Sequence, residues 1–492
     1  MTDVTTAATA AESLDVLIVG AGLSGIGAAW HLQRKCPGRR YAILEARAAS
    51  GGTWDLFRYP GIRSDSDMYT LGYDFRPWRE AKAIADGPSI LAYVREAARE
   101  GGIDRHIRYR HRVTHASWSD ADKRWTVEVD RGQEAGPARF TCSFLLMCSG
   151  YYDYAAGYTP RFEGTDDFEG RIVHPQHWPA DLDYAGKRVV VIGSGATAVT
   201  LVPAMAATAA HVTMVQRSPT YVVSRPAEDR IANALRRVLP AGLAYGLARW
   251  KNVLLGMVFY HLCKRRPDKA RAMILDGVRH ELGPDYDIDR DFAPRYAPWD
   301  QRLCLVPDGD LFRSIRQGRV SVVTDEIERF TTGGLRLRSG REIEADVVVT
   351  ATGLALQLMG GMTLEVDGRP VDPAETVTYK GMMYSGVPNL AVVSGYTNAS
   401  WTLKADLVCA YVCRLLNHMQ RKGLRECRPT LDDPAMPRLP SIDFSSGYIQ
   451  RSLHLLPKQG DRAPWRLHQN YALDLLGLRY GTVTDRAMQF SR

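Results

Sequence analysis

The sequence predicts an α/β protein with two Rossmann-like dinucleotide-binding domains and a helical insertion in the second. A short apolar strand runs into a glycine-rich loop and then a helix at residues 15–34, and the same pattern returns at 188–207. The alternation of strands and helices breaks off over residues 224–311. With 492 residues, 45% of them hydrophobic, the chain exceeds what one core usually covers, so several domains are expected.

The first unit begins with the apolar strand 15–19. This strand leads into a GxGxxG loop with glycines at Gly20, Gly22 and Gly25. The next strand ends at Glu45, 25 residues after Gly20, where a carboxylate can accept hydrogen bonds from a ribose. Glycines alone are weak support because they also serve turns. Between a strand and a helix, however, they let a pyrophosphate approach the helix N-terminus.

The second unit has the strand 188–192, followed by Gly193, Gly195 and Thr197 at the start of a helix. After its next strand comes Arg217, where an NAD-binding site would present an acid. A guanidinium at this point suits a 2′-phosphate, which favours NADPH over NADH. Taken alone, Arg217 is equally well explained as a surface residue of a turn.

The insertion carries the excess positive charge of the chain. Residues 225–271 hold eleven Lys and Arg against three acids, which equals the net charge of +8. No nucleic-acid-binding motif accompanies this segment, so we exclude nucleic acid as a partner. A solvated helical face is one interpretation. The other is a basic helical face that contacts anionic membranes peripherally, because charges interrupt every apolar run long enough to span a bilayer.

The compartment is predicted from the N-terminus and the cysteines. Residues 1–14 contain no Lys or Arg and lack the basic start of a targeting peptide, so the cytoplasm is expected. The eight cysteines include no CxxC pair, and we interpret them as reduced core thiols.

A motif between the two units identifies a family. Residues 168–179 read Phe-Glu-Gly-Arg-Ile-Val-His-Pro-Gln-His-Trp-Pro, which matches FxGxxxHxxxWP, and this string resembles the fingerprint of Baeyer–Villiger monooxygenases. The final Trp178-Pro179 distinguishes it from the related flavin-containing monooxygenases. The resemblance covers residues 14–471, and the segments 51–67 and 299–307 are most similar to the mycobacterial ethionamide-activating FAD-containing subgroup.

The resemblance assigns roles to individual residues. On the FAD side it implies Gly20, Gly22, Gly25, Glu45, Gly52, Thr53, Trp54 and Asp65, and on the NADPH side Gly193, Gly195, Thr197 and Arg217. Arg302 matches the active-site arginine of the family, and Asp65 is expected to hold it and temper its charge. His174 is expected to act in a linker that couples domain motion to the flavin. We predict no metal site there, because prolines prevent a helix that would align His174 with His177.

The chemistry implied by the family is hydride transfer from NADPH to FAD, addition of O2, and attack of the resulting C4a-peroxyflavin on the substrate. Ketones would give esters, and thioethers or thioamides would be oxidised at sulfur. A permanently charged Arg302 would stabilise the anionic intermediate. The alternatives are an N- or S-hydroxylating monooxygenase, a pyridine-nucleotide disulfide reductase, against which the missing CxxC counts, and a flavin-binding redox sensor. The oligomeric state and the physiological substrate stay open.

Two positions depart from the family pattern. Gln301 stands where many relatives have Lys, which removes one expected contact to the 2′-phosphate and weakens the NADPH assignment, and Ser64 stands where many have Cys. The domain limits follow from the motifs. We expect the FAD domain at 1–155 and 388–492, the NADPH domain at 156–223 and 312–387, and the insertion at 224–311.

Overall fold

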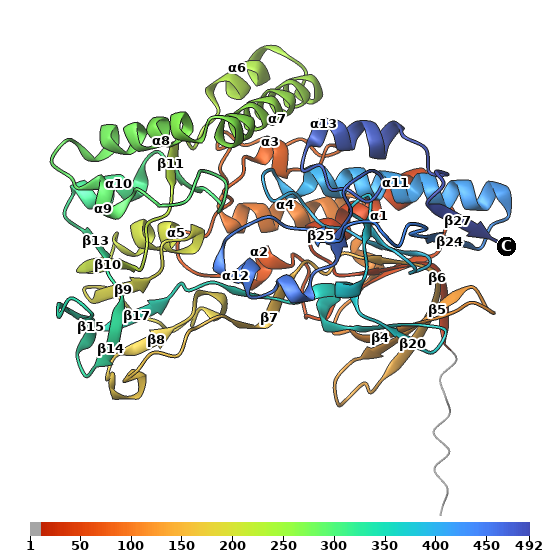
Figure 1. The fold of residues 1–492 in the computed structure, drawn as a ribbon, viewed down its shortest axis with the longest axis horizontal. Helices are drawn as coiled ribbons and strands as arrows, with labels where there is room; N and C mark the ends of the chain where they lie inside the picture. The colour runs from red at the N-terminus through yellow and green to blue at the C-terminus, as the bar shows by residue number, and fades with distance from the viewer. Residues whose placement is uncertain (1–10) are drawn as a thin grey trace, which may run out of the picture.

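The computed structural model describes residues 11–492 and contains two domains built on sheets, with helices along one edge of the molecule (Figure 1). Residues 1–10, which carry most of the N-terminal segment used to predict the compartment, lie outside the described residues. None of the helices within 11–492 has the length and apolarity needed to cross a bilayer.

The larger domain contains a nine-stranded sheet in the order β20-β19-β4-β5-β6-β1-β2-β3, with β23 paired to β6. Five of its strands pair in parallel around β1: β1 (Glu12–Val19), β2 (Tyr41–Leu44), β3 (Ile107–Arg108), β6 (Ala138–Met147) and β23 (Leu390–Val392). Val16 and Ile18 of β1 pack in one apolar cluster with α1 (Leu23–Lys35), α4 (Gly87–Glu100) and α11 (Trp401–Lys422). Leu17 and Val19 pack in another cluster with β4 (Arg112–Ser119) and β5 (Arg124–Asp130).

The smaller domain contains a fully parallel five-stranded sheet in the order β13-β10-β9-β17-β8. The strands are β8 (Arg171–Val173), β9 (Arg188–Ile192), β10 (His211–Gln216), β13 (Val320–Thr324) and β17 (Val347–Thr350). One face packs on α5 (Ala196–Met205) and α10 (Asp310–Arg316). The other packs on the antiparallel sheet of β14 (Ile327–Thr331), β15 (Gly334–Leu337) and β16 (Glu342–Glu344). The predicted pair of Rossmann-like domains is confirmed.

The predicted helical insertion is also confirmed. It contains α6 (Arg230–Val238), α7 (Ala241–Arg265), α8 (Pro267–Leu282) and α9 (Ile288–Asp291). Strands β11 (Val222–Arg225) and β12 (Cys304–Pro307) pair in parallel where the chain enters and leaves it. Helix α7 contacts α3 (Met68–Leu71), so the insertion also packs against the larger domain.

The chain returns to the larger domain earlier than the expected residue 388. Strands β19 (Thr363–Val366) and β20 (Arg369–Val371) lie within 312–387, yet β19 pairs with β4 of the larger sheet and β20 with β19. The crossing between the domains is made by β7 (Tyr152–Gly157) and β18 (Leu354–Leu356), which pair antiparallel. The return therefore follows β18.

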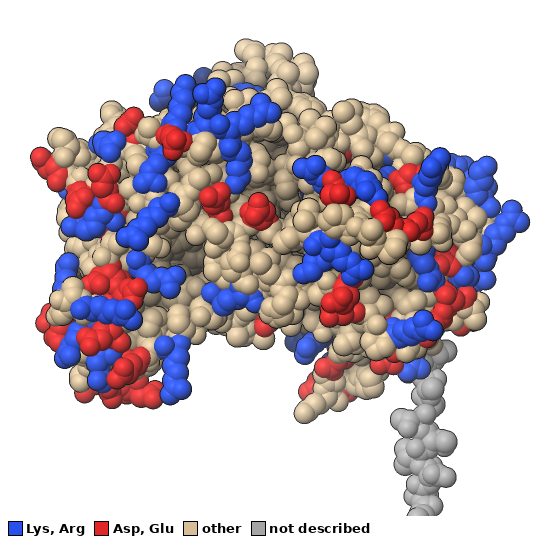
Figure 2. All heavy atoms as spheres, in the orientation of Figure 1, with Lys and Arg blue, Asp and Glu red and all other residues tan. Residues whose placement is uncertain are grey.

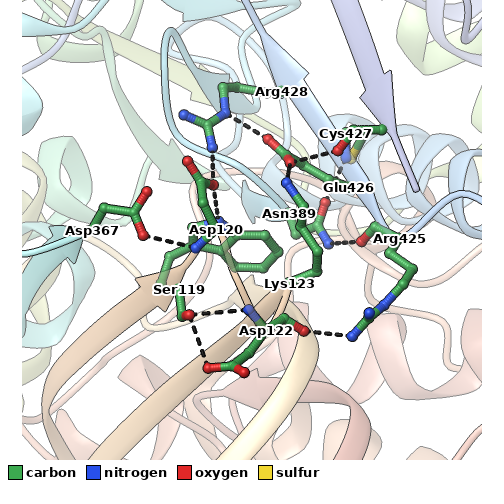
Figure 3. A network of polar contacts seen from close by, with 12 residues as sticks. Ser119, Asp120, Asp122, Lys123, Asp367, Asn389, Arg425, Glu426, Cys427 and Arg428 are labelled. Carbon is green, nitrogen blue, oxygen red and sulfur yellow. Dashed lines mark hydrogen bonds and ion pairs between the residues drawn. The ribbon is translucent and has the colours of Figure 1, made fainter.

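A polar network joins the turn between β4 and β5 to β24 (Glu426–Pro429) near the C-terminus (Figure 3). Lys123 and Arg428 both form ion pairs with the buried Glu426, and Ser491 Oγ donates to the same carboxylate at 2.7 Å. Burial raises the pKa of Glu426, but these three donors outweigh it, so the pKa lies below its ordinary value. The network thus ties segments about 300 residues apart while its central carboxylate is charged.

Candidate functional site

A cavity of about 500 Å³, the glycine cavity, lies beside the loop that follows β1 and the C-terminal end of β2. Its wall contains seven of the eight predicted FAD-side residues: Gly20, Gly22, Glu45, Gly52, Thr53, Trp54 and Asp65. Gly25 does not line it. A Cβ at Gly25 would lie 1.9 Å from the carbonyl oxygen of Gly20, so this glycine allows α1 to pack closely on the loop.

The floor of the glycine cavity is shaped by two glycines. A Cβ on Gly52, whose φ is +56°, would lie 3.1 Å from the Cα of Gly22. Helix α1 begins directly after Gly22, has no side-chain cap and carries no acid in its first turn. Its first N–H groups are therefore available to an anion. These features fit the pyrophosphate of FAD.

Glu45 is buried at the end of β2 and faces the same cavity. Its Oε2 accepts the N–H of Ala21 at 2.8 Å, and its Oε1 accepts the N–H of Arg47 at 2.9 Å. Burial raises the pKa of Glu45 although these hydrogen bonds oppose the shift. The carboxylate keeps acceptor capacity for ribose hydroxyl groups.

Two further cavities meet the first. The insertion cleft, about 590 Å³, lies between α6, α7 and the loops that carry Asp65 and Trp299. The aromatic cavity, about 160 Å³, is lined mainly by apolar and aromatic side chains, among them Leu356, Tyr448 and Ile449. Arg302 lines all three cavities, and no other residue within 11–492 does so.

Arg302 is held by a two-point ion pair with Asp65. Nε lies 2.8 Å from Oδ2 and Nη2 lies 2.9 Å from Oδ1. Asp300, two residues before Arg302 in the chain, pairs with Lys264 at 2.9 Å and not with Arg302. Asp65 raises the pKa of Arg302 despite the burial that opposes it. Nη1 has no hydrogen-bond partner among residues 11–492, so its two N–H groups are available where the cavities meet.

Several aromatic residues around this junction were not predicted. Tyr151 stacks on Trp401, with ring centroids 5.3 Å apart and planes at 19°, and both line the glycine and aromatic cavities. Tyr154 holds Thr53 through hydroxyl groups 3.1 Å apart. The run of tyrosines at 151, 152 and 154, directly after a strand exit, was a usable signal. The sequence contains no such signal for Trp401, because this residue comes from a helix 250 residues after Tyr151.

The four predicted NADPH-side residues line none of these three cavities. Gly193 has φ of +129°, and Gly195 faces open space, since a Cβ there would meet nothing within 4 Å. Helix α5 begins directly after Gly195, again without a side-chain cap or an acid in its first turn. Thr197 is half-buried in that first turn, and Arg217 is exposed at the end of β10 with no ion pair in the described part of the chain. An open helix N-terminus and a free guanidinium fit a nucleotide with a 2′-phosphate.

His174 lies where the chain crosses between the domains. Its Nδ1 accepts the N–H of Gln176 at 3.2 Å, which leaves Nε2–H to donate to the carbonyl oxygen of Gly353 at 3.2 Å. Burial lowers the pKa of His174, so the neutral ring is favoured. Its imidazole occupies the space beside Gly157, where a Cβ would lie 2.0 Å away. His174 therefore bonds to backbone where the chain crosses between the domains, and its coupling of domain motion to the flavin stays a prediction.

Within residues 11–492, one group of ligand-type side chains lies outside the three cavities. His31, Asp74 and Asp406 place one potential ligand atom each within 4.8 Å of one another. The guanidinium of the buried Arg249 lies 3.4 Å from Asp406, and its charge opposes a cation at this place. The cluster is better explained as a partly buried network of charged groups, with His31 and Asp406 buried and Asp74 exposed.

Comparisons with known proteins agree with this architecture. Residues 18–84 match the NAD(P)-binding Rossmann-like domain, and residues 78–238 match the flavin-binding monooxygenase-like family. The FAD-containing monooxygenase EthA of Mycobacterium tuberculosis is 58% identical over 98% of both chains, and EthA of Mycolicibacterium smegmatis is 54% identical over the same shares. The solved structure of a steroid monooxygenase bound to NADP has the same fold, with a TM-score of 0.77, 24% identity, and coverage of 98% of this chain and 100% of that chain.

Proposed function

This chain belongs to the family of FAD-containing monooxygenases that includes EthA, within the Baeyer–Villiger class of flavoproteins, and we propose that it oxygenates small ketones and soft sulfur groups beside Arg302. The coenzymes are FAD and NADPH. The observation that carries the proposal is the position of Arg302, which borders all three cavities and has free N–H donors there.

Each coenzyme has a set of residues that would hold it. For FAD these are the uncapped N-terminus of α1, the facing glycines Gly22 and Gly52, and Glu45 for the ribose. For NADPH they are the uncapped N-terminus of α5 and Arg217 for the 2′-phosphate. When bound, these coenzymes supply the hydride and the activation of O2 that no side chain can provide.

Arg302 has the role of stabilising negative charge on the oxygen atoms of the reacting substrate. Its guanidinium stays charged at any working pH, and Asp65 fixes its plane through two hydrogen bonds. Tyr151, Tyr152 and Tyr448 lie near it in the walls of the glycine and aromatic cavities, and a substrate that displaces water from these cavities would strengthen its field. Asp65 acts as a positioning residue because it is bonded to Arg302.

The wall of the aromatic cavity defines the kind of substrate. It is mostly apolar, so it favours a hydrophobic ketone or thioether over a charged molecule. Lys404 also lines this cavity but is paired with Asp474 at 2.7 Å, so the guanidinium of Arg302, which has free N–H groups, is the cation that the substrate's polar atom would meet. An N- or S-hydroxylating monooxygenase would use the same coenzymes but would not need a cation beside a developing oxyanion.

A disulfide reductase is disfavoured by the cysteines. All eight are free and buried, and only Cys148 lines the glycine cavity, whereas a reductase needs a pair of thiols beside its flavin. Reduced thiols and the use of NADPH also support our proposal that the enzyme works in the cytoplasm.

Product analysis tests the proposed function. The FAD-loaded enzyme is incubated with NADPH and O2 and with a panel of ketones and thioethers. We expect esters and sulfoxides in amounts that match the NADPH consumed. Oxidation of NADPH that yields only hydrogen peroxide with every compound would contradict the proposal, and reduction of a disulfide would favour the reductase.

A further inference from the structure

The outer face of α7 is apolar over most of its length. Every exposed residue between 241 and 258 is uncharged. Six large hydrophobic side chains on this face are between 44% and 68% exposed: Leu243, Leu247, Trp250, Leu254, Leu255 and Val258. At 1.5 Å per residue the stretch from Leu243 to Val258 is about 22 Å long, so this is an extended hydrophobic strip.

Neighbouring helices extend the strip into a larger surface. Ile231 and Val238 of α6 are exposed beside it, and Leu476 and Tyr480 are exposed in η7 (Leu475–Tyr480), which follows α13 (Tyr471–Asp474). Of the fifteen large exposed hydrophobic residues in the described chain, eleven belong to α6, α7, α13 and η7. We call this surface of α6, α7, α13 and η7 the apolar ridge; its helices lie along one edge of the molecule (Figure 1). Apolar areas of this extent on one face mark interaction sites.

Along residues 241–258 of α7 the basic residues do not lie on the outer face, so the expected basic helical face is not formed over this stretch. Arg249 is buried and donates to the carbonyl oxygens of Tyr69 and Gly72, and Lys251 pairs with Asp229. The inward side of this part of the helix therefore carries the charges, and the outward side carries the hydrophobic residues.

Unpaired cations border the apolar ridge. Arg230 and Arg237 are exposed on α6, and Arg265, Arg266 and Lys269 are exposed where α7 passes into α8. None of the five has an ion pair with an acid among residues 11–492. Figure 2 shows uncharged residues at the top of the molecule over α6 and α7, with Lys and Arg gathered beside them. A hydrophobic surface with a basic border has the chemistry that recognises an anionic lipid bilayer.

We propose that the apolar ridge docks this enzyme onto the surface of an anionic phospholipid bilayer, with α7 lying in the plane of the interface. The hydrophobic side chains would enter the boundary between headgroups and acyl chains, and the bordering cations would meet the lipid phosphates. A second copy of the chain is a less favourable occupant, because a symmetric contact would bring the same unpaired cations together.

The docking surface adjoins the mouth of the insertion cleft. Arg230, Ile231 and Leu255 are exposed on the ridge or its border and also line the cleft, whose inner end contains Arg302. A hydrophobic substrate dissolved in the bilayer would therefore enter without passing through bulk water. This route rests on the proposed oxygenase function, whereas the docking itself does not.

Vesicle co-sedimentation of the FAD-loaded enzyme without substrate tests the docking. We expect binding to vesicles of phosphatidylcholine with phosphatidylglycerol, weaker binding to phosphatidylcholine alone, and loss of most binding at high salt. Trp250 should shift its fluorescence to shorter wavelength on binding. The double variant Leu247→Ser/Leu254→Ser should lose on the order of 10²-fold in affinity, and Arg265→Ala/Arg266→Ala about tenfold or more.

The matched control is Leu439→Ser/Leu455→Ser, which changes two exposed leucines outside the apolar ridge and should bind as the wild type does. Circular dichroism and NADPH-dependent flavin reduction check that each variant is folded. Equal sedimentation with both kinds of vesicle, no sedimentation with either, or full binding by the ridge variant would overturn the proposal. Dimerisation that the ridge variant abolishes, without vesicle binding, would assign the surface to a second copy instead. A failed oxygenation assay with intact vesicle binding would refute only the proposed function.

Discussion

Replacing Arg302 by alanine separates a catalytic role from a structural one. The ion pair with Asp65 joins side chains that are 36% and 30% exposed, so its loss should cost only about 0–1 kcal/mol of stability. Removing a cation beside developing negative charge should cost much more in rate. By analogy with the loss of one oxyanion donor, Arg302→Ala should lower the rate of ketone oxygenation by on the order of 10²–10³. Flavin reduction by NADPH should fall far less, because it creates no oxyanion.

Stopped-flow flavin reduction and ester formation should be measured side by side on the folded, FAD-loaded variant. Lys264→Ala is the matched control, because it removes the ion pair with Asp300, which lies two residues before Arg302 in the chain. The side chains of this pair are about as exposed as those of Arg302 and Asp65, and neither residue lines any of the three cavities. Lys264→Ala should change neither rate. Undiminished ester yield in Arg302→Ala would refute the argument, and an equal loss of flavin reduction would assign Arg302 to placing the nicotinamide.

Three other predictions test the coenzyme sites and the network near the C-terminus. Arg217→Ala should raise the KM for NADPH about tenfold or more and leave the KM for NADH unchanged, and equal use of both coenzymes by the wild type would contradict the assignment. Gly52→Ala should release FAD, measured by free flavin fluorescence, whereas Gly368→Ala, with positive φ but open space around it, should keep it. Glu426→Gln should lower the free energy of unfolding by about 1.5–3 kcal/mol at neutral pH. Because the folded-state pKa of Glu426 is lowered, its contribution is present above its unfolded pKa of about 4.3 and is lost as pH falls, so the difference in Tm should vanish in acid.

The parts of the site that could be predicted from the sequence are local ones. Gly20, Gly22 and Glu45 are constrained by a strand, a tight loop and a helix that are consecutive in the chain, so their spacing predicts where they lie. Arg302 and Asp65 are 237 residues apart, and no spacing rule joins them. Their pairing was predicted only because a family resemblance assigned both roles.

The hydrophobic spacing along α7 predicts the helix but not which of its sides faces the core. The spacing of Leu243, Leu247 and Trp250 correctly predicts a helix, but a hydrophobic strip is normally expected to face the core. In this fold the other side of α7 packs on the larger domain, where Arg249 donates hydrogen bonds to the carbonyl oxygens of Tyr69 and Gly72. The sequence analysis also did not predict that the short strands at 363–371 belong to the larger domain. Local spacing cannot show this, because β4, with which β19 pairs, lies about 250 residues earlier in the chain.

Isotope labelling of the product tests the central claim most directly. The FAD-loaded enzyme is supplied with NADPH, a ketone that it converts and ¹⁸O2, and the product is analysed by mass spectrometry. We predict an ester that contains one ¹⁸O atom per molecule, with the label absent when ¹⁸O is supplied only as water. A product without the label, or complete consumption of NADPH with no oxygenated product, would contradict the assignment of this chain as a monooxygenase acting on ketones.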